Sequence, residues 1–185
     1  MEERYSRNRL YVSEREQSII KDYKIFLGGA GIGSIVAECA LRLGFEHITI
    51  VDGDKIERSN LNRQNYTEND IGRYKAECLA ERLQSINPDA QIDFHTEFLT
   101  PNNIEEMLNE HDVSINALDF KDKTPFVFDE ICKERKIPVL HPYNFGWAGF
   151  VTVVDPLGHS LSELTEEPKG FELKVAEYVT GHGAF

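Results

Sequence analysis

The sequence lacks the features of a membrane protein, a disulfide-stabilised secreted domain and a zinc protein. No apolar run approaches the roughly 20 residues that a membrane-spanning helix needs, and the charged start MEERYSRNRLYVSERE does not resemble a signal peptide. The three cysteines, Cys39, Cys78 and Cys132, are far apart and form no CxxC pair. We therefore expect a cytoplasmic protein without a zinc site, whose cysteines are packing residues on helices.

Positive charge is also scarce. The 185 residues include 20 Lys and Arg against 32 Asp and Glu, giving a formal net charge of −12. Such a chain repels phosphate backbones, so nucleic acid is not expected as a general partner, although a local basic patch could overrule the average. The length fits one domain with a sizeable core.

Short apolar runs alternate with segments of helical periodicity between residues 24 and 156. The runs predict strands at 24–29, 47–54, 91–99, 112–119, 137–143 and 149–156, and the periodic segments predict helices at 34–45, 75–87, 100–111 and 124–136. Regular alternation of this kind predicts an α/β fold, namely a Rossmann-like, doubly wound, mainly parallel sheet with helices on both faces.

Three regions follow from this reading. Residues 1–22 are polar and are predicted to be partly helical, residues 23–156 form the Rossmann-like domain, and residues 157–185 form a tail. The tail is loop-like at first, and FELKVAEYVTG then predicts one short helix that ends at Gly181.

A glycine turn joins the first predicted strand to the first long helix. GGAGIGS carries Gly28, Gly29, Gly31 and Gly33, and glycines let the backbone approach a phosphate at the amino end of a helix. Asp52 follows about 20 residues later, where an acid binds ribose hydroxyls in dinucleotide-binding folds. The turn indicates nucleotide binding but does not choose among NAD, FAD and ATP.

Polar and cationic residues crowd the segment after the second predicted strand: Asp54, Asn60, Arg63, Gln64 and Lys75. Hydride transfer gains little from cations near the phosphates, whereas a reaction that builds negative charge on phosphorus gains a great deal. The acids Asp54 and Asp119 are candidates to hold magnesium. His141 and Tyr143, at the end of another predicted strand, are interpreted as packing or loop residues rather than substrate contacts.

Several motifs in this order resemble the ThiF/MoeB/HesA family, relatives of the ubiquitin-activating enzymes. The stretch DGDKIERSNLNRQ at 52–64 is similar to the family's D-x-D…N-L-x-R-Q signature. Further similarities are RYSRNR at 4–9, IGRYKAE at 71–77, SINALDF at 114–120 and GWAGFVTVVDP at 146–156. The resemblance covers about residues 4–156.

This resemblance implies magnesium-dependent and ATP-dependent adenylation of a carboxylate, usually the C-terminal Gly-Gly of a ubiquitin-like sulfur-carrier protein. It implies that Asp52 binds ribose, that Asn60, Arg63 and Lys75 contact the phosphates, and that Asp119 holds the magnesium-bound triphosphate. Arg7 would reach the ATP of a neighbouring subunit, so the N-terminal arm would serve a homodimer. The expected nucleotide-binding residues are Gly29, Gly31, Gly33, Asp52, Asp54, Asn60 and Gln64.

The chain departs from the family's pattern in four places. Ala30 stands where the turn usually has glycine, Asn116 replaces an acid and Phe120 replaces an asparagine. The tail over 157–185 resembles the start of the family's crossover loop, and either it is truncated or the protein lacks thiol chemistry. The alternatives are a tRNA-modifying dehydratase of the same superfamily, an NAD-dependent oxidoreductase and a non-catalytic subunit of an activating heterodimer.

Overall fold

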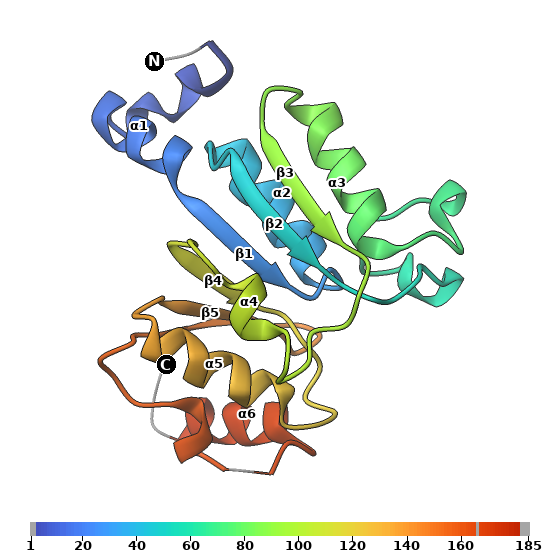
Figure 1. Ribbon diagram of the computed structural model, residues 1–185, viewed down its shortest axis with the longest axis vertical. Coiled ribbons are helices and arrows are strands. Elements are labelled where there is room, and N and C mark those ends of the chain that lie inside the picture. Colours follow the sequence, from blue (N-terminus) through green and yellow to red (C-terminus); the bar gives the residue numbers. More distant parts are fainter. Residues whose placement is uncertain (1–2, 166, 182–185) are drawn as a thin grey trace.

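A six-stranded sheet forms the centre of the computed structural model, which describes residues 3–165 and 167–181 (Figure 1). The strand order is β3-β2-β1-β4-β5-β6. Neighbouring strands are parallel except for β6, which runs antiparallel to β5. The strands are β1 (Lys24–Gly28), β2 (His47–Val51), β3 (Gln91–His95), β4 (Val113–Asn116), β5 (Val139–Asn144) and β6 (Gly149–Val154).

Helices connect the parallel strands. The α-helices are α1 (Glu14–Asp22), α2 (Gly33–Leu43), α3 (Lys75–Ile86), α4 (Ile104–Met107), α5 (Thr124–Glu134) and α6 (Phe171–Gly181). Short 3₁₀ helices are η1 (Glu3–Leu10), η2 (Arg58–Asn60), η3 (Glu68–Asp70) and η4 (Leu161–Glu163). The predicted α/β fold with a mainly parallel sheet is confirmed.

Alternation along the strands gives the sheet two apolar faces, each covered by its own helices (Figure 1). Ile25 and Leu27 of β1 belong to the core beneath α2 and α3. Phe26, between them, belongs to a second core that includes residues of α4, α5 and α6. The doubly wound arrangement therefore follows from β-strands whose side chains are apolar on both sides.

The chain reverses its direction of winding between β1 and β4. From β1 it moves outward through β2 to β3, then returns to place β4 on the other side of β1. In open parallel sheets, ligands bind at such a switch point, beyond the carboxyl ends of the strands. The fold therefore marks the region where the glycine turn, Asp52 and the segment after β4 meet.

The N-terminal arm is fastened to the opposite edge of its own domain. Tyr5 is buried and its hydroxyl donates to Glu46 Oε1 at 2.8 Å. Asn8 donates to the carbonyl of Leu43, at the carboxyl end of α2, at 3.0 Å. These bonds place η1 near the amino ends of the strands, and α1 begins with a capping box at Ser13.

The tail packs on the α5 side of the sheet. Phe171 and Val175 of α6 are fully buried in the second core, and the ring of Phe171 stacks on Phe120 with 4.2 Å between centroids. The predicted short helix is present as α6. Of the expected tail, residues 166 and 182–185 lie outside the described part of the chain, as do residues 1–2 of the expected arm.

Two details differ from the sequence-based expectation. Cys78 and Cys132 are buried as expected, but Cys39 is exposed, because α2 turns Ala37 and Leu41 toward the sheet and leaves Cys39 on its outer side. The helix predicted over 100–111 shrinks to α4, since Asn103 Oδ1 accepts a hydrogen bond from the Thr100 amide in a turn before it.

Candidate functional site

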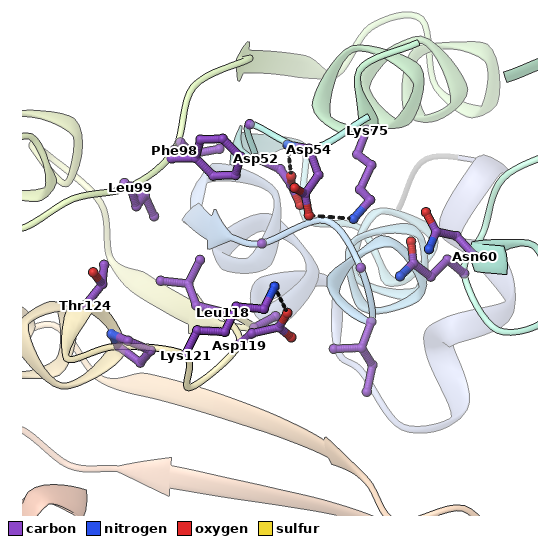
Figure 2. A pocket seen from close by; sticks show the side chains of 18 of the residues that line it. Asp52, Asp54, Asn60, Lys75, Phe98, Leu99, Leu118, Asp119, Lys121 and Thr124 are labelled. Carbon is purple, nitrogen blue, oxygen red and sulfur yellow. Dashed lines mark hydrogen bonds and ion pairs between the residues drawn. The ribbon is translucent and has the colours of Figure 1, made fainter. Parts of the chain in front are cut away.

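An open cavity of about 660 Å³ lies at the switch point of the sheet (Figure 2). Its wall is built from the glycine turn, the segment after β2, the start of α3, the segment after β3, and the turn between β4 and α5. Every predicted nucleotide-binding residue except Gly33 lines it directly. Segments far apart in the sequence thus converge on one concave surface, as sequence reasoning anticipated for this edge of the sheet.

The glycine turn is shaped for close backbone approach. Gly29 has φ +92°, and a Cβ there would lie 2.5 Å from the carbonyl oxygen of Ala117, so no other residue fits. Gly33 is buried behind the turn, where a Cβ would lie 2.7 Å from Leu27 Cδ1. Helix α2 begins at Gly33 without a side-chain cap. The amides of Ser34 and Ile35 already donate to the carbonyls of Gly31 and Ile32, so an anion at this end of α2 would meet the helix dipole and the backbone of the preceding turn.

Asp52 braces the turn from the end of β2. Its Oδ2 accepts from the Ala30 amide at 2.6 Å and its Oδ1 from the Asp54 amide at 2.7 Å. Burial raises the pKa of the Asp52 carboxyl, although these two amide bonds and the charge of Lys75 oppose the shift. Each carboxylate oxygen still has a free lone pair, which leaves it able to accept a ribose hydroxyl.

The segment from Glu57 to Tyr66 places amide side chains on the cavity wall. Asn60 is buried and its Oδ1 accepts from the Glu57 amide at 2.9 Å. Gln64 lies against the glycine turn, its Nε2 3.3 Å from the position of a Cβ on Gly31. The buried Oε1 of Gln64 has no hydrogen-bond partner within residues 3–165 and 167–181.

Arg63 lines the cavity but stays exposed to solvent. Its Nη1 donates to the Ser59 carbonyl at 2.9 Å and to Asn62 Oδ1 at 3.0 Å. These bonds hold the guanidinium at the opening of the cavity and involve only Nη1, so its other N–H groups can donate to another acceptor.

Lys75 and Asp54 form an ion pair on the wall, with 2.9 Å between Nζ and Oδ2. Lys75 is the first residue of α3 and is buried, and its amide donates to the Asp54 carbonyl at 3.0 Å. Figure 2 shows the lysine reaching across the wall to this carboxylate.

A second ion pair faces the first across the cavity (Figure 2). Lys121 Nζ lies 2.7 Å from Asp119 Oδ2, and both side chains are mostly exposed. The hydrogen bond to Asp119 raises the pKa of the Lys121 ammonium. The side chains of Asp54 and Asp119 thus put an exposed carboxylate on each wall, each balanced by a lysine.

Sequence reasoning missed one end of the cavity, which is apolar. Phe98 and Leu99 follow β3 and Leu118 follows β4, and all three line the cavity near Asp52 (Figure 2). A Cβ on Gly53 would lie 2.8 Å from the Phe98 ring, so the phenyl group rests directly on the Asp52–Asp54 backbone. Lys121 and Thr124 were missed as well. The sequence could have indicated these five residues by their position alone, since each lies between the carboxyl end of a parallel strand and the first turn of the next helix.

Arg7 is the one expected catalytic residue that does not line this cavity. It belongs to η1, at the amino edge of the sheet.

Ala30 causes no strain in the glycine turn, because φ is positive at only two non-glycine residues of the described chain, Glu110 and Lys136. Phe120 and Asn116 both point into the interior, where they are buried.

Comparison with known proteins decides the family. The chain matches the ThiF family over residues 5–179. The chain belongs to the ThiF family. It is 32% identical over 160 residues to the tRNA threonylcarbamoyladenosine dehydratase of Haemophilus influenzae, covering 85% of this chain and 59% of that protein. The resemblance drawn from the sequence motifs is thereby confirmed.

Other ThiF-family relatives carry adenylyltransferase names. The chain is 33% identical to the sulfur carrier protein ThiS adenylyltransferase of Bacillus subtilis strain 168, covering 83% of this chain and 47% of that protein. The crystal structure of Escherichia coli tRNA N6-threonylcarbamoyladenosine dehydratase, TcdA, in complex with ATP is 32% identical, with a TM-score of 0.71 over 75% of this chain and 58% of that one. The chain thus spans about half to three-fifths of the length of these relatives.

No helix within residues 3–165 and 167–181 is both long and apolar enough to cross a membrane. Within the same residues no three His, Cys, Asp or Glu side chains gather in the way a metal ion would need. A metal in this ThiF-family cavity would have to take part of its coordination from a bound ligand.

Proposed function

We propose that this protein uses ATP to adenylate a carboxylate. One observation carries the proposal: the cavity combines a glycine turn, a strand-end acid and paired lysines and carboxylates on opposite walls. A nicotinamide enzyme needs the turn and the acid but gains nothing from two lysines beside the phosphates. Membership in a family with an ATP-bound structure supports the same reading.

The two ends of the cavity suit the two ends of ATP. The adenine ring would lie against Phe98, Leu99 and Leu118, the apolar end. The ribose would lie at Asp52, and the phosphates would lie over Gly29 and Gly31 at the amino end of α2. Gln64 lies against Gly31, so its Nε2 would donate to a phosphate oxygen.

The residues of the cavity fit a magnesium ion that arrives with the nucleotide. Mg²⁺ commonly takes one or two carboxylates and completes its coordination with phosphate oxygens and water. Asp54 and Asp119 supply those carboxylates, and both are accessible from the cavity. The ion would neutralise charge on the triphosphate.

The proposed step is a displacement at the α-phosphorus. A carboxylate oxygen of the substrate forms a bond to the α-phosphorus, the bond to the bridging oxygen breaks, and pyrophosphate leaves with the electron pair. Because two anions must meet, Lys75 and Arg63 would lower the barrier by neutralising the phosphate oxygens, and Asn60 would orient them by hydrogen bonding. No side-chain nucleophile is needed, in keeping with the absence of Cys39, Cys78 and Cys132 from the cavity lining.

Two acceptors fit this chemistry. The first is the C-terminal carboxylate of a ubiquitin-like or sulfur-carrier protein, which the similarity to the ThiS adenylyltransferase favours. The second is a small carboxylate on tRNA, which the similarity to the dehydratases favours. The net charge of −12 favours the protein acceptor, because it opposes the approach of a nucleic acid.

We also propose that the working unit is a homodimer. Arg7 lies at the far edge of its own sheet, so the contact with ATP that the resemblance implies would require the cavity of another copy. Val151 and Val153 of β6 are 57% and 62% exposed and pair with Pro142 and Leu140 of β5. Leu140 packs partly on the α2 side, so the part of this face over β5 and β6 is apolar and exposed beyond the helices, and a second copy would bury it.

ATP–pyrophosphate exchange tests the proposal. Purified protein is incubated with ATP, magnesium, labelled pyrophosphate and either a Gly-Gly-ended carrier protein or threonylcarbamoyl-modified tRNA, and label entering ATP is counted. Exchange with one acceptor identifies the substrate class. Arg63→Ala is expected to abolish exchange, whereas Arg58→Ala, in the same loop but paired with Glu68 and outside the cavity, keeps it.

Other outcomes would assign the protein to another class. Thermal stabilisation by NAD but not by ATP would indicate an oxidoreductase. A folded dimer that binds no ATP would indicate a non-catalytic subunit. Near-normal exchange by the Arg63→Ala variant would contradict the role given to the cation cluster.

A further inference from the structure

A buried polar network lies directly behind the cavity wall. Asn116 at the end of β4, Asp129 on α5 and His141 on β5 are each at most 4% exposed. Asn116 Nδ2 donates to Asp129 Oδ1 at 3.0 Å, and His141 Nε2 lies 2.9 Å from the same oxygen. Because a carboxylate only accepts, the second contact requires a proton on Nε2 of His141.

Asn116 ties together two segments that line the cavity. Its Nδ2 also donates to the carbonyl of Pro125, at the start of α5, at 2.9 Å. Its Oδ1 lies 3.4 Å from the amide nitrogen of Leu118, which donates toward it from the turn after β4. Leu118 and Pro125 both line the cavity, but Asn116 does not. One side chain therefore sets the spacing between the two parts of this wall.

Asp129 and the Pro125 carbonyl together fix the orientation of that amide, because both only accept hydrogen bonds. A primary amide can flip and exchange its donor and acceptor ends. With Asp129 Oδ1 as a partner, the NH₂ group must face α5, which leaves the oxygen facing the Leu118 amide. His141 holds Asp129 in place from the neighbouring strand.

We propose that Asn116, held by Asp129, is a positioning residue for the nucleotide-binding wall that carries Leu118 and Asp119. The proposal rests on the nucleotide site proposed above. Asn116 touches no ligand in this role; it keeps the β4 turn and the start of α5 at the separation that the cavity needs. The replacement of the family's acid by asparagine at this position is thus an interior feature rather than a lost metal ligand.

The test compares two buried asparagines at opposite ends of the sheet. Asn87 is 1% exposed, and its Nδ2 donates to the Tyr5 hydroxyl and to Glu46 Oε1, both at 3.2 Å. Both Asn116→Ala and Asn87→Ala remove buried hydrogen bonds and should lower Tm. Titration calorimetry with ATP should show Kd raised roughly three- to tenfold for Asn116→Ala, the effect of about one hydrogen bond, and unchanged for Asn87→Ala.

A second pair of variants covers the case in which Asn116→Ala fails to fold. Asp129→Asn keeps an oxygen acceptor for Asn116 and should bind ATP as the unmodified protein does, whereas Asp129→Ala should bind more weakly. A Kd for Asn116→Ala within twofold of the unmodified protein, or an equal loss in Asp129→Asn and Asp129→Ala, would overturn the positioning role alone. An unmodified protein that binds no ATP would overturn the proposed function and this inference with it.

Discussion

Lys75 Nζ lies 2.9 Å from Asp54 Oδ2 at the first turn of α3, and the lysine side chain is only 8% exposed. A cation at this end of a helix is repelled by the helix dipole, and its burial adds a desolvation cost. The ion pair with Asp54 offsets part of the dipole repulsion and part of the desolvation cost. Lys75 therefore remains unfavourable for folding, which is expected of a charge that serves ligand binding.

Lys75→Met should therefore separate stability from binding. We expect the Kd for ATP to rise by about tenfold or more, because a buried charge-assisted bond to phosphate is lost. We expect Tm to stay the same or rise, since the dipole is no longer opposed and Asp54 remains near the helix terminus. Titration calorimetry and thermal unfolding measure the two effects, and unchanged ATP affinity would count against the role of Lys75.

Lys121 and Lys123 offer a matched pair on the opposite wall. Both are exposed, but only Lys121 lines the cavity. Lys121→Ala should raise the Kd for ATP by roughly threefold, a smaller effect than at Lys75 because solvent screens an exposed charge. Lys123→Ala should have no effect. An equal loss of ATP affinity in the two variants would show that Lys121 acts through the overall charge of the protein rather than through a contact with ATP.

Glu38 should make the fold sensitive to acid. Burial alone would raise its pKa, but hydrogen bonds from Arg82, Asn65 and Arg42 lower it to about 2. A carboxyl with a depressed pKa stabilises the fold above its unfolded pKa, and the contribution disappears as the pH falls toward 2. Glu38→Gln should lower the free energy of unfolding by about 1–3 kcal/mol at pH 7.

Urea unfolding at pH 7 and pH 3 would measure this difference. The difference in unfolding free energy between Glu38→Gln and the unmodified protein should narrow at pH 3. At that pH Glu38 binds a proton in the unfolded state but not in the native state, which stabilises the unfolded state of the unmodified protein. A gap that widened on acidification would contradict the low pKa. Asn65 follows Gln64 in the sequence, so the same variant should also loosen the loop that carries Arg63.

Asp52 should give nucleotide binding its own pH dependence. Burial raises the pKa of this carboxyl, so it should protonate at a higher pH than an ordinary aspartate, whose pKa is about 3.9. Affinity for ATP should then fall on acidification as the ribose acceptor is lost. The ratio of Kd between Asp52→Asn and the unmodified protein cancels the titration of ATP itself, and this ratio should approach one at low pH. A ratio independent of pH would exclude Asp52 from binding.

The sequence predicted the sheet well because its strands are apolar on both sides and its glycine turn has a single structural solution. It predicted helix α2 but was wrong about its buried face, since Cys39 was expected to pack and is exposed. Periodicity identifies a helix, but the face that meets the sheet depends on packing. The helix expected over 100–111 failed because Asn103 favours a turn.

The cavity residues that belong to short sequence motifs could be predicted, whereas those that meet only after folding, from segments far apart in the sequence, could not. Asp52 could be named from its spacing after the glycine turn, and Asn60, Arg63 and Lys75 from their crowding after β2 and from the resemblance to the ThiF family. Phe98 and Leu118 belong to different crossovers, so their meeting depends on the strand order. The inward direction of Asn116 could have been read from strand alternation, since Ile115 next to it faces the α2 side.

The stacking of Phe120 on Phe171 connects the tail to the cavity wall. Phe120 directly follows Asp119, whose carboxylate faces the cavity. A change that displaced α6 would remove the Phe171 ring from both Phe120 and Phe126 and would leave the residue next to Asp119 without its stacking partner. No residue of α6 lines the cavity, so a change in α6 would act on the proposed nucleotide site only through the packing of Phe120.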